Sequence, residues 1–548
     1  MSRTREHVMT SELQSELAQQ AGPPRDLTMS RRTMAASVNQ LVSQTAIDVL
    51  RRGGNAVDAA IAGAAMLMVV EPRNGHLGGD TFMLFHDARQ DCVIALNGSG
   101  AAPARATLEH YREIGGIPED GLLTCTVPGT VACWGHANER YGSVPLAELL
   151  APAIAHADEG IPVTTRLHHM LTLDAPTYRT SPDSAAVFLP DGRVPSVGAI
   201  WRQPGLAASL RRVAEHGVDD FYRGELAREL VDYSDRHSGL FTLDDLARHE
   251  TQERPPLSMD YRGYTVHEQP PVSQGILVLL ALNILAQFDL QQYGPGTAET
   301  LHLEIEALKL AFEDQAAYLG DPAFVDISVG HLLSEEHARE QASHIDLYSA
   351  RSGLAPAPSH PDTTYMCTAD ESGSMVSYIH SLYAGAGVVM GDTGVLMNSR
   401  LQGFNLDEGH PDCLAPGKRP LHTLNNYVVH KDGKPILVGG TPGAHWQVQT
   451  NLQILVNILE FGMDVQQAVE APRFTMGDQL SLGSQTVRIE SRVGQDAADA
   501  LTDRGQQVEV VGPWDAPGAV QLIMRDPETG IYRGATEVRR AGSTVLGF

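Results

Sequence analysis

The sequence predicts an α+β fold in which helices cover β-sheets. The chain has 548 residues, 42% of them apolar, so it can bury a large core. Strand-rich and helix-rich segments alternate along it, as expected when helices cover sheets. The longest apolar runs, 59–70 and 276–286, fall short of the about 20 residues that cross a membrane, and they predict buried helices.

The first 28 residues predict a flexible leader. They are polar and lack the apolar stretch of a secretory signal. The five cysteines are scattered, odd in number and without a Cys-x-x-Cys pair, which is typical of reduced thiols. We therefore expect a cytoplasmic protein, with Cys367 inside the core.

Near the N-terminus, two helices are expected with a tight stop between them. The first helical pattern covers residues 39–52 and ends at Gly53-Gly54. Asn55 then caps the next helix, with Asp58 as the acid of its first turn. The glycine pair lacks the Lys-Ser/Thr that a phosphate-binding P-loop requires, so we assign it a structural role.

The middle of the chain, residues 105–345, shows mainly helical spacing. Between 299 and 320, apolar residues recur at i, i+3, i+4 and i+7, and we expect the acids of this helix to face solvent. A short strand is expected at 263–267. The proline-containing stretch 270–275 separates it from the next helix.

A β-hairpin is expected at 362–380. Two alternating runs rich in β-branched and aromatic residues flank a turn at 371–374. The first run opens with Asp362, Thr363 and Thr364, directly after a Pro/Ser-rich stretch where an internal cut would create a new N-terminus. An N-terminal threonine supplies both nucleophile and base, its hydroxyl and its α-amine. A Thr-Thr pair is also a common, purely structural start of a strand.

The remainder of the chain is rich in short strands and shows no internal repeat. Strands are expected at 394–397, 426–430, 436–439, 487–490, 508–511, 520–524 and 531–534, and a helix at 448–461.

The charge balance disfavours some partners. Lys and Arg number 40 against 67 Asp and Glu, a formal net charge of −27. Such acidity argues against a nucleic-acid partner and against an anionic membrane surface. No group of His, Cys, Asp and Glu has the spacing of metal ligands, so we expect neither a metal nor another cofactor.

Seven short motifs follow one another along the chain. They are Arg52–Ala60, Leu77–Asp80, Val127–Gly129, Asp362–Thr364, Pro416–Pro420, Gly440–Gly443 and Glu470–Arg473. In this order, over residues 29–548, they resemble the γ-glutamyltranspeptidase family of N-terminal-nucleophile hydrolases. The resemblance implies a four-layer αββα sandwich. It also implies one domain cut into a large chain, 29–362, and a small chain, 363–548, that stay associated.

The resemblance implies a chemistry for these motifs. Thr363 Oγ would attack the Asp362 carbonyl and form an ester that water cleaves, which frees the α-amine of Thr363. The mature threonine would then attack a small-molecule amide and pass the acyl group to water or an amine. Thr364 is expected to help orient the nucleophile. The N–H groups of Gly443 and Ala444 are expected to form the oxyanion hole, although a plain strand-to-helix turn would have the same sequence.

Substrate recognition differs from that of the γ-glutamyl enzymes. By resemblance, the arginine that clamps the glutamyl carboxylate corresponds to Ser99, and the serine pair to His422-Thr423. The amine-binding aspartate corresponds to Gly403, and an asparagine to Ser381. Without charged clamps, an α-amino acid head group has little to hold it. This pattern resembles the family's amidohydrolase branch, which includes oxamate amidohydrolase-like proteins and has cephalosporin acylases as neighbours.

The candidate substrate-binding residues are Ser99, Ser381, Arg400, His422, Thr423, His445 and Trp446. Arg400 is expected either to bind an acidic acyl end or to pair with an acid such as Asp407. Single histidines in β-rich regions are more often structural. Two alternatives stay open: a genuine γ-glutamyltransferase or glutathione hydrolase, and an unprocessed homologue that binds a metabolite without catalysis.

Overall fold

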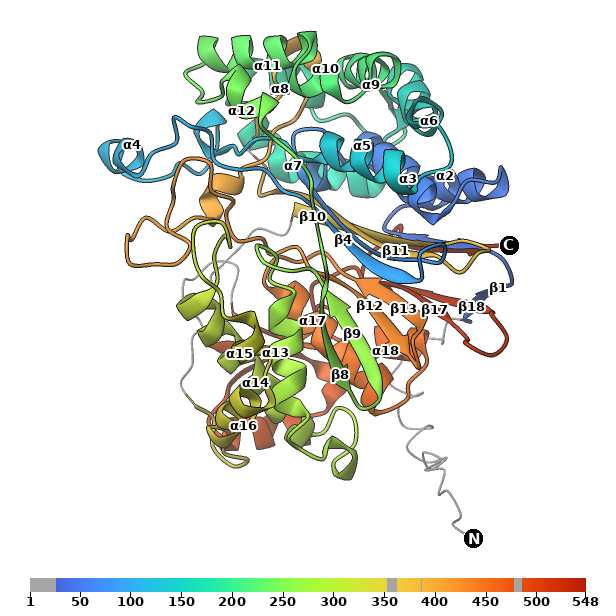
Figure 1. Ribbon diagram of the computed structural model, residues 1–548, viewed down its shortest axis with the longest axis vertical. Helices are drawn as coiled ribbons and strands as arrows, with labels where there is room; N and C mark the ends of the chain where they lie inside the picture. The colour runs from blue at the N-terminus through green and yellow to red at the C-terminus, as the bar shows by residue number, and fades with distance from the viewer. Residues whose placement is uncertain (1–25, 352–361, 386, 478–484) are drawn as a thin grey trace.

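The computed structural model describes residues 26–351, 362–385, 387–477 and 485–548. Most of the leader expected at 1–28 lies outside the described residues. Two β-sheets lie face to face in the middle of the molecule, and each carries a layer of helices on its outer face (Figure 1). The four-layer αββα sandwich expected from the sequence is therefore confirmed.

One sheet, called here the β10 sheet, has seven strands paired antiparallel. In spatial order they are β19 (Thr544–Gly547), β2 (Met34–Ser37), β10 (Asp362–Ala369), β11 (Met375–Tyr383), β3 (Asp80–Asp87), β4 (Cys92–Gly98) and β7 (Gln252–Arg254). The hairpin expected at 362–380 is the β10–β11 pair, and it lies in the middle of this sheet.

The second sheet, called here the β13 sheet, also has seven antiparallel strands. They are β1 (Thr28–Ser30), β18 (Tyr532–Thr536), β17 (Gln521–Arg525), β13 (Lys434–Gly440), β12 (Asn426–Lys431), β9 (Tyr264–Glu268) and β8 (Leu257–Tyr261). Both sheets combine strands from before and after position 362, so the described residues form one interlocked unit.

The helices between residues 40 and 247 lie on the side of the β10 sheet, and all but the one at Leu108–Glu113 contribute to the core on its outer face (Figure 1). They are α2 (Gln40–Arg51), α3 (Ala56–Val70), α4 (Leu108–Glu113), α5 (Thr130–Tyr141), α6 (Leu146–Glu159), α7 (Thr165–Tyr178), α8 (Pro182–Phe188), α9 (Pro204–His216), α10 (Asp219–Tyr222), α11 (Glu225–Arg236) and α12 (Leu243–Ala247). A two-stranded ribbon of β5 (Ile161–Pro162) and β6 (Ile200–Trp201) lies among them.

The helices that follow cover the β13 sheet (Figure 1). They are α13 (Ile276–Leu285), α14 (Ala298–Tyr318), α15 (Val329–Leu332), α16 (Glu335–Ser343), α17 (Trp446–Leu455), α18 (Val465–Glu470) and α19 (Gln495–Asp503). A small sheet of β14 (Phe474–Met476), β15 (Thr486–Glu490) and β16 (Gln507–Val511) completes this half.

The central strands β2, β11 and β3 of the β10 sheet are buried on both faces, which explains their nearly continuous apolar sequences. In β3, Phe82 and Leu84 point between the sheets, whereas Met83 and Phe85 point toward the helices. In β10, Tyr365 and the expected core residue Cys367 likewise belong to the core between the sheets. This alternation fixes which face of β10 each threonine occupies.

The helix stop near the N-terminus forms as expected. Asn55 accepts the N–H of Asp58, and Asp58 accepts the N–H of Asn55, a reciprocal capping box at the start of α3. Gly53 has φ +92°, a conformation that suits glycine at a helix end. Asp58 also accepts hydrogen bonds from Ser143, and the Ala56 N–H donates to Asp370, so the motif joins α3 to neighbouring segments of the fold.

Two expectations about local structure were wrong. Glu304 and Glu306 of α14 are buried rather than solvated, because α14 lies inside the helical layer, where Lys309 Nζ pairs with Glu306 at 2.8 Å. Residues 394–397 form only isolated bridges, Leu396 to Val389 and Met397 to Gly78, and not a strand of either sheet. All five cysteines are free, as expected.

Candidate active site

Three polar side chains form a row across the β10 sheet at one end of its strands. Thr363 on β10 pairs with Ser381 on β11, and Ser381 pairs with Asp80 on β3. Residues paired across neighbouring strands project from the same face. The row lies on the face toward the β13 sheet, because Tyr365, two residues after Thr363, belongs to the core between the sheets.

Within this row, Thr363 Oγ1 lies 3.0 Å from Ser381 Oγ, and only 3% of Thr363 is exposed. Ser381 Oγ also accepts the N–H of Tyr383 at 2.8 Å, which fixes its position. The sequence predicts that Ser381 contacts the substrate. The structure places its hydroxyl directly against the nucleophile candidate. Strand β10 begins at Asp362, but the Asp362 side chain lies outside the described residues.

Thr364 points to the opposite face of β10 from Thr363, as strand alternation requires. Its neighbour on that face, Thr368, donates to the Ala56 carbonyl of α3 at 2.7 Å. Thr364 Oγ1 is buried and has no hydrogen-bond partner in the described structure. The expected support of Thr363 by the Thr364 side chain is therefore not a contact between the two hydroxyls, and Ser381 occupies that position instead.

A glycine-rich turn, 440–445, follows β13 and leads into α17. Gly443 has φ +138° and Ala444 has φ +52°, so both depart from ordinary strand or helix geometry. Their carbonyls accept hydrogen bonds from Trp446 and Gln447. Their N–H groups donate no hydrogen bond to any described residue. Two neighbouring free N–H groups are what an oxyanion hole requires.

The glycine turn extends from a strand that lies directly over β10. A Cβ placed on Gly440 would be 2.5 Å from the ring of Tyr365, so only glycine allows this approach. Ser377 of β11 donates to the Gly439 carbonyl at 3.1 Å. Gln274 Nε2 donates to the carbonyls of Thr423 and Ala444, at 2.6 and 3.0 Å. It therefore joins the His422-Thr423 segment to the glycine-rich turn.

Arg400 lies at the Asp80 end of the row and is fully buried. Its Nε donates to Asp80 Oδ2 at 3.2 Å, and its guanidinium lies 4.7 Å from the centre of the Tyr383 ring. Arg400 therefore pairs with Asp80, and the expected pairing with Asp407 was wrong, because Asp407 lies in an exposed turn. Its Nη1 and Nη2 are buried without an acceptor among the described residues.

Burial is the largest cause of the pKa shifts of Asp80, Arg400 and His422. It raises the pKa of Asp80 to about 6, although Arg400 and the Gly100 N–H act in the opposite direction. Burial also lowers the pKa of Arg400, and Asp80 only partly counters this. For His422, burial and the charges of Arg400 and Arg419 lower the pKa well below its usual range, so this imidazole is neutral.

The other predicted pocket residues divide into two groups. Ser99 donates to Asn97 Oδ1 at 2.6 Å, and its carbonyl accepts from Arg419 Nε at 3.0 Å. His422 is buried against the edge of Phe82, with both ring nitrogens unpartnered in the described structure. Thus Ser99 and His422 lie around Arg400 and Arg419.

His445 and Trp446 lie elsewhere. The His445 ring contacts Phe312 of α14, and burial lowers its pKa to about 4. The indole of Trp446 donates to the Met476 carbonyl of β14 at 3.2 Å. Both side chains therefore contact the elements outside the β13 sheet, and neither contacts the row of Thr363, Ser381 and Asp80.

Sequence reasoning missed Asp80, Tyr383 and Arg419. Asp80 and Arg419 lie in two of the seven motifs, Leu77–Asp80 and Pro416–Pro420, so their positions carried a signal that went unassigned. No sequence signal identified Tyr383, whose φ of +66° is unusual for a residue other than glycine.

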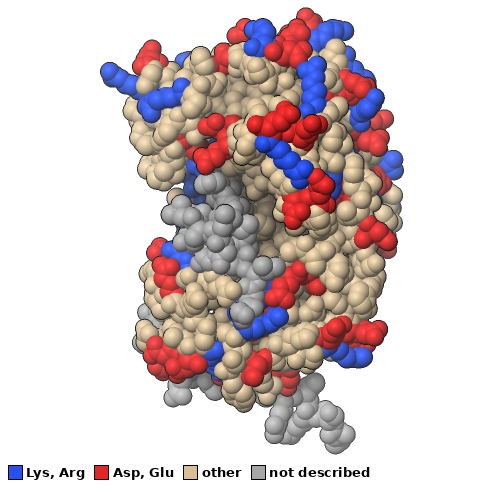
Figure 2. Space-filling view, turned by 90° about the vertical axis from the view of Figure 1, so that its left-hand side faces the viewer, with Lys and Arg blue, Asp and Glu red and all other residues tan. Residues whose placement is uncertain are grey.

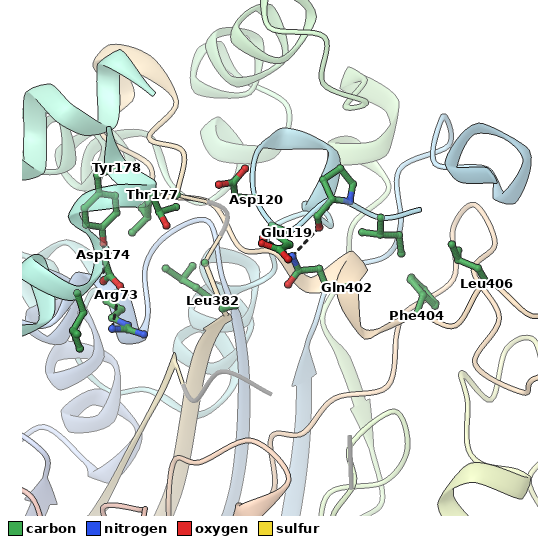
Figure 3. A pocket seen from close by; sticks show the side chains of 17 residues that line it. Arg73, Glu119, Asp120, Asp174, Thr177, Tyr178, Leu382, Gln402, Phe404 and Leu406 are labelled. Atoms are coloured by element: carbon green, nitrogen blue, oxygen red, sulfur yellow. Dashed lines mark hydrogen bonds and ion pairs between the residues drawn. The ribbon is translucent and has the colours of Figure 1, made fainter. Parts of the chain in front are cut away.

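A cavity of about 760 Å³ lies at the end of β11, where Leu382, which packs toward the helices of the β10 sheet, forms part of its wall. Its described walls include Leu382, next to Ser381, and Gln402 and Phe404, close in sequence to Arg400 (Figure 3). Arg73 and Asp174 pair across its other side at 3.0 Å. Figure 2 shows a hollow in the middle of the face on which α4 lies, with acidic side chains near its rim. Thr363 is not part of the cavity wall, because it points to the other face of the sheet.

Among the residues that the structure describes, no group of three or more His, Cys, Asp or Glu is arranged to hold a metal ion. Among the described helices, none is both long and apolar enough to cross a membrane.

Comparison with known proteins decides the family. A family model described as "Gamma-glutamyltranspeptidase" matches residues 42–547. The chain belongs to the γ-glutamyltranspeptidase family. It is accordingly an enzyme that acts on amide C–N bonds, and the resemblance found in the seven motifs is confirmed.

Relatives in the γ-glutamyltranspeptidase family match nearly the whole chain. The "Glutathione hydrolase-like YwrD proenzyme" of Bacillus subtilis is 37% identical, over 93% of this chain and 98% of its own length. The "Oxamate amidohydrolase proenzyme" of Klebsiella pneumoniae is 35% identical, over 94% and 99%. The crystal structure of a cephalosporin acylase from Bacillus halodurans superposes with a TM-score of 0.90 and 38% identity, covering 96% of this chain and 98% of that one.

Proposed function

We propose that this protein is an autoprocessed amide hydrolase whose mature nucleophile is an N-terminal Thr363. The observation that carries the proposal is the hydroxyl pair of Thr363 and Ser381, 3.0 Å apart at the start of a central strand. The turn at Gly443 and Ala444 presents two N–H groups without a described acceptor, and it follows Gly440, which lies against Tyr365, two residues after Thr363. Relatives described as proenzymes support self-cleavage.

The first reaction would cut the precursor. Thr363 Oγ attacks the Asp362 carbonyl, the peptide C–N bond breaks, and the nitrogen becomes the α-amine of Thr363. Water then hydrolyses the ester, which leaves Asp362 as a carboxylate and restores the Thr363 hydroxyl. The products are a chain ending at Asp362 and a chain of residues 363–548, held together by the shared sheets.

The second reaction would use the new terminus. A free α-amine has a pKa of about 7.7–8.0 and accepts the hydroxyl proton near neutral pH, which an amide nitrogen cannot do. Thr363 Oγ then attacks the substrate amide, and the N–H groups of Gly443 and Ala444 stabilise the oxyanion. The amine leaves with a proton, and water releases the acyl group from the acyl-enzyme. Where an amine replaces water, the same intermediate gives acyl transfer.

The substrate would be a small-molecule amide without an α-amino group. Ser99 and Gly403 stand where the family's charged clamps are expected, and Gly403 offers no side chain to an ammonium group. The oxamate amidohydrolase and cephalosporin acylase among the relatives support an amidohydrolase or acylase. A γ-glutamyltransferase or glutathione hydrolase is the second candidate, favoured by the 34% identical glutathione hydrolase proenzyme of Escherichia coli.

Self-cleavage is tested by intact-mass analysis of purified protein. The expected result is a fragment that begins at Thr363. Thr363→Ala should remain one chain and be inactive, whereas Thr368→Val, at a buried threonine of the same strand, should be cut normally. A cut at another bond, or an active uncut protein, would contradict the mechanism. One uncut, inactive chain would favour the unprocessed binding homologue.

A cytoplasmic location is also proposed. The five free cysteines support it, since extracellular proteins more often carry disulfides. Cell fractionation that places the mature chains outside the cytoplasm would overturn this assignment.

A further inference from the structure

The peptide group between Pro442 and Gly443 carries one of the two N–H groups of the candidate oxyanion hole, and a neighbouring side chain fixes its orientation. Thr441 Oγ1 donates to the Pro442 carbonyl at 2.9 Å. No other described residue donates to this carbonyl. Because the C=O and N–H of a trans peptide point in opposite directions, the bond turns the Gly443 N–H away from Thr441.

Glycine cannot hold this orientation by itself. Gly443 has φ +138°, and a residue without Cβ moves readily between backbone regions. A rotation of the peptide before it would place the Pro442 carbonyl, instead of the Gly443 N–H, against the negative charge of a reaction intermediate. The next peptide, which carries the Ala444 N–H, is held inside the turn, where the Trp446 N–H donates to the Gly443 carbonyl at 2.9 Å. The Gly443 N–H therefore depends on Thr441.

The Thr441 hydroxyl is itself fixed from a second side. Thr441 is fully buried, and its Oγ1 accepts the Ala519 N–H at 2.9 Å. Only a hydroxyl can accept this bond and donate to Pro442 at the same time. A Cβ placed on Gly518 would be 3.0 Å from Thr441 Oγ1, and φ +121° at this position suits glycine. The segment 516–519 therefore lies directly against the hydroxyl.

Two buried carboxylates fix the segment 516–519. Glu490 Oε1 accepts the Ala516 N–H at 3.1 Å, at the start of the segment. Glu537 Oε2 accepts the Val520 N–H at 3.3 Å, directly after its end. Both carboxylates are fully buried, and together they hold the segment at both ends.

Three arginines pair with the two carboxylates. Arg473 Nη1 donates to Glu537 at 2.7 Å. Arg539 donates to Glu490 at 2.6 Å and to Glu537 at 3.0 Å, and Arg492 donates to Glu490 at 2.6 Å. Burial would raise the pKa of Glu537, but Arg473 and Arg539 outweigh it and lower the pKa to about 2. We call these five residues the charge network.

We propose that Thr441 is a positioning residue of the oxyanion hole, and that the charge network holds Thr441 in place through the segment 516–519. The inference rests on the proposed function, since it takes the Gly443 N–H as a donor to the oxyanion. It also gives a task to Arg473, which belongs to the motif Glu470–Arg473 and has no part in the proposed reaction. Because the charge network acts through backbone N–H groups, changes in it should alter kcat rather than KM.

The first test replaces the hydroxyl and measures cut protein. Thr441→Val keeps the shape of the side chain but can neither donate nor accept, so we expect kcat about 10- to 100-fold lower and KM within about threefold of wild type. Thr441→Ser keeps the hydroxyl and should stay within about threefold of wild type in kcat. The substrate is whichever of glutaryl and γ-glutamyl p-nitroanilide the wild type turns over faster.

Thr450→Val is the matched control. The Thr450 hydroxyl is buried without a hydrogen-bond partner among the described residues, and it lies 3.9 Å from the same Cβ position on Gly518. Its removal should leave kcat unchanged. A kcat of Thr441→Val equal to that of Thr450→Val, or an equal loss in Thr441→Ser and Thr441→Val, would overturn the inference.

A transition-state analogue gives a readout besides turnover. The Thr363 hydroxyl adds to the boron of butylboronic acid and passes its proton to the α-amine, which leaves a tetrahedral, negatively charged adduct. The inhibition constant of butylboronic acid should rise in Thr441→Val by about the same factor as kcat falls. An unchanged inhibition constant would overturn the inference.

A double-mutant cycle tests the link to the charge network. Glu537→Gln should lower kcat, and its effect should not add to that of Thr441→Val, because both act on the same chain of hydrogen bonds. Glu460→Gln is the control, since this buried glutamate bonds Tyr261 and Arg262 instead. Additive effects of Glu537→Gln and Thr441→Val would overturn the assignment to the charge network.

The two levels of the proposal can fail separately. If Thr441→Val does not fold or is not cut, a crystal structure of the wild-type butylboronate adduct decides. The inference requires the Gly443 N–H on the adduct oxygen and the Pro442 carbonyl on Thr441, and any other orientation of this peptide overturns it. If cut wild-type protein hydrolyses no amide, the proposed function fails and the inference fails with it. An active wild type with unaltered Thr441→Val protein overturns the inference alone.

Discussion

At the scale of single residues, the site is defined by side chains that stay unsatisfied inside a well-packed core. Thr363 shares its hydrogen bond with Ser381, while Arg400 and His422 retain free donors in buried positions. Such groups cost stability unless function uses them. Arg400 joins the row of Thr363, Ser381 and Asp80 through its hydrogen bond to Asp80.

Ser381→Ala is expected to slow both self-cleavage and turnover. The change removes the hydroxyl that lies against Thr363 Oγ1, a contact worth about 1–2 kcal/mol, or about 5- to 30-fold in rate. Ser381→Thr keeps the hydroxyl and should restore most of the rate. The control is Ser377→Ala, on the same strand and face, where the hydroxyl bonds Tyr365 and Gly439 instead. Time courses of cleavage by denaturing gel would show the difference, and equal rates in the two alanine variants would contradict it.

The absence of a residue that would bind the substrate's ammonium group predicts which of two anilides has the higher kcat/KM. With Ser99 and Gly403 in place of two charged clamps, a γ-glutamyl anilide should be about 10²–10⁴-fold poorer than in a clamped enzyme, at 1.5–3 kcal/mol for each lost contact. We expect glutaryl anilide, which lacks the α-amine, to be the better substrate here. The measurement is kcat/KM for both compounds. A glutamyl preference above about tenfold, or 1.4 kcal/mol, would favour the γ-glutamyltransferase.

At the scale of elements, the turn between β13 and α17 depends on its backbone. Gly443→Ala should lower kcat by about 10²-fold or more, because φ +138° is a glycine conformation and a forced change would turn the Gly443 N–H away. Ala444→Gly keeps the N–H and relieves strain at φ +52°, so kcat should fall far less. Gly462→Ala is the control. It introduces similar strain at φ +69°, after α17, and should affect stability alone. Equal kcat in Gly443→Ala and Gly462→Ala would argue against an oxyanion hole at this turn.

Elements were predictable where local chemistry decides them. The cap at Asn55 and the hairpin at 362–380 follow from residue preferences over a few positions, and both formed as expected. The acids of α14 were misplaced, because helical spacing cannot show that Gln506, 200 residues further along the chain, bonds Glu306 beside Lys309 of the same helix. The partner of Arg400 was misassigned for the same reason: Asp80 is 320 residues away in sequence and becomes a neighbour only through the order of the strands.

At the scale of the whole molecule, three imidazoles join the two sheets at one edge of the sandwich. His86 of β3 lies 5.2 Å from His430 of β12, which lies 4.7 Å from His267 of β9, measured between ring centres. Burial lowers the pKa of His267 to about 4 and that of His430 to about 3, and it also lowers the pKa of His86. The charged groups that act on the three rings are Asp87, Asp91, Asp260 and Arg525.

These histidines predict acid sensitivity. Their pKa values are lower in the folded than in the unfolded state, so their contribution to stability is complete above pH 6.5 and is lost progressively as pH falls toward 4 for His267 and toward 3 for His430. Each histidine adds a slope of at most about 1.4 kcal/mol per pH unit. Urea unfolding at pH 7.5 and 5 should show a weaker pH dependence for the His267→Gln/His430→Gln double variant than for wild type. The exposed His216→Gln should behave as wild type. An unchanged dependence in the double variant would exclude the cluster as the cause.

The position of β10 has a consequence for how such an enzyme can be encoded. β10 lies between β2, from before the proposed cut, and β11, from after it. If two genes supplied the pieces, each product would leave the ribosome with half-finished sheets, whose open edges and apolar faces invite aggregation. A single reading frame avoids this, because every strand finds its neighbours before any bond is broken. Cleavage after folding thus allows a buried strand to begin with a free amine without the two pieces ever having to find each other.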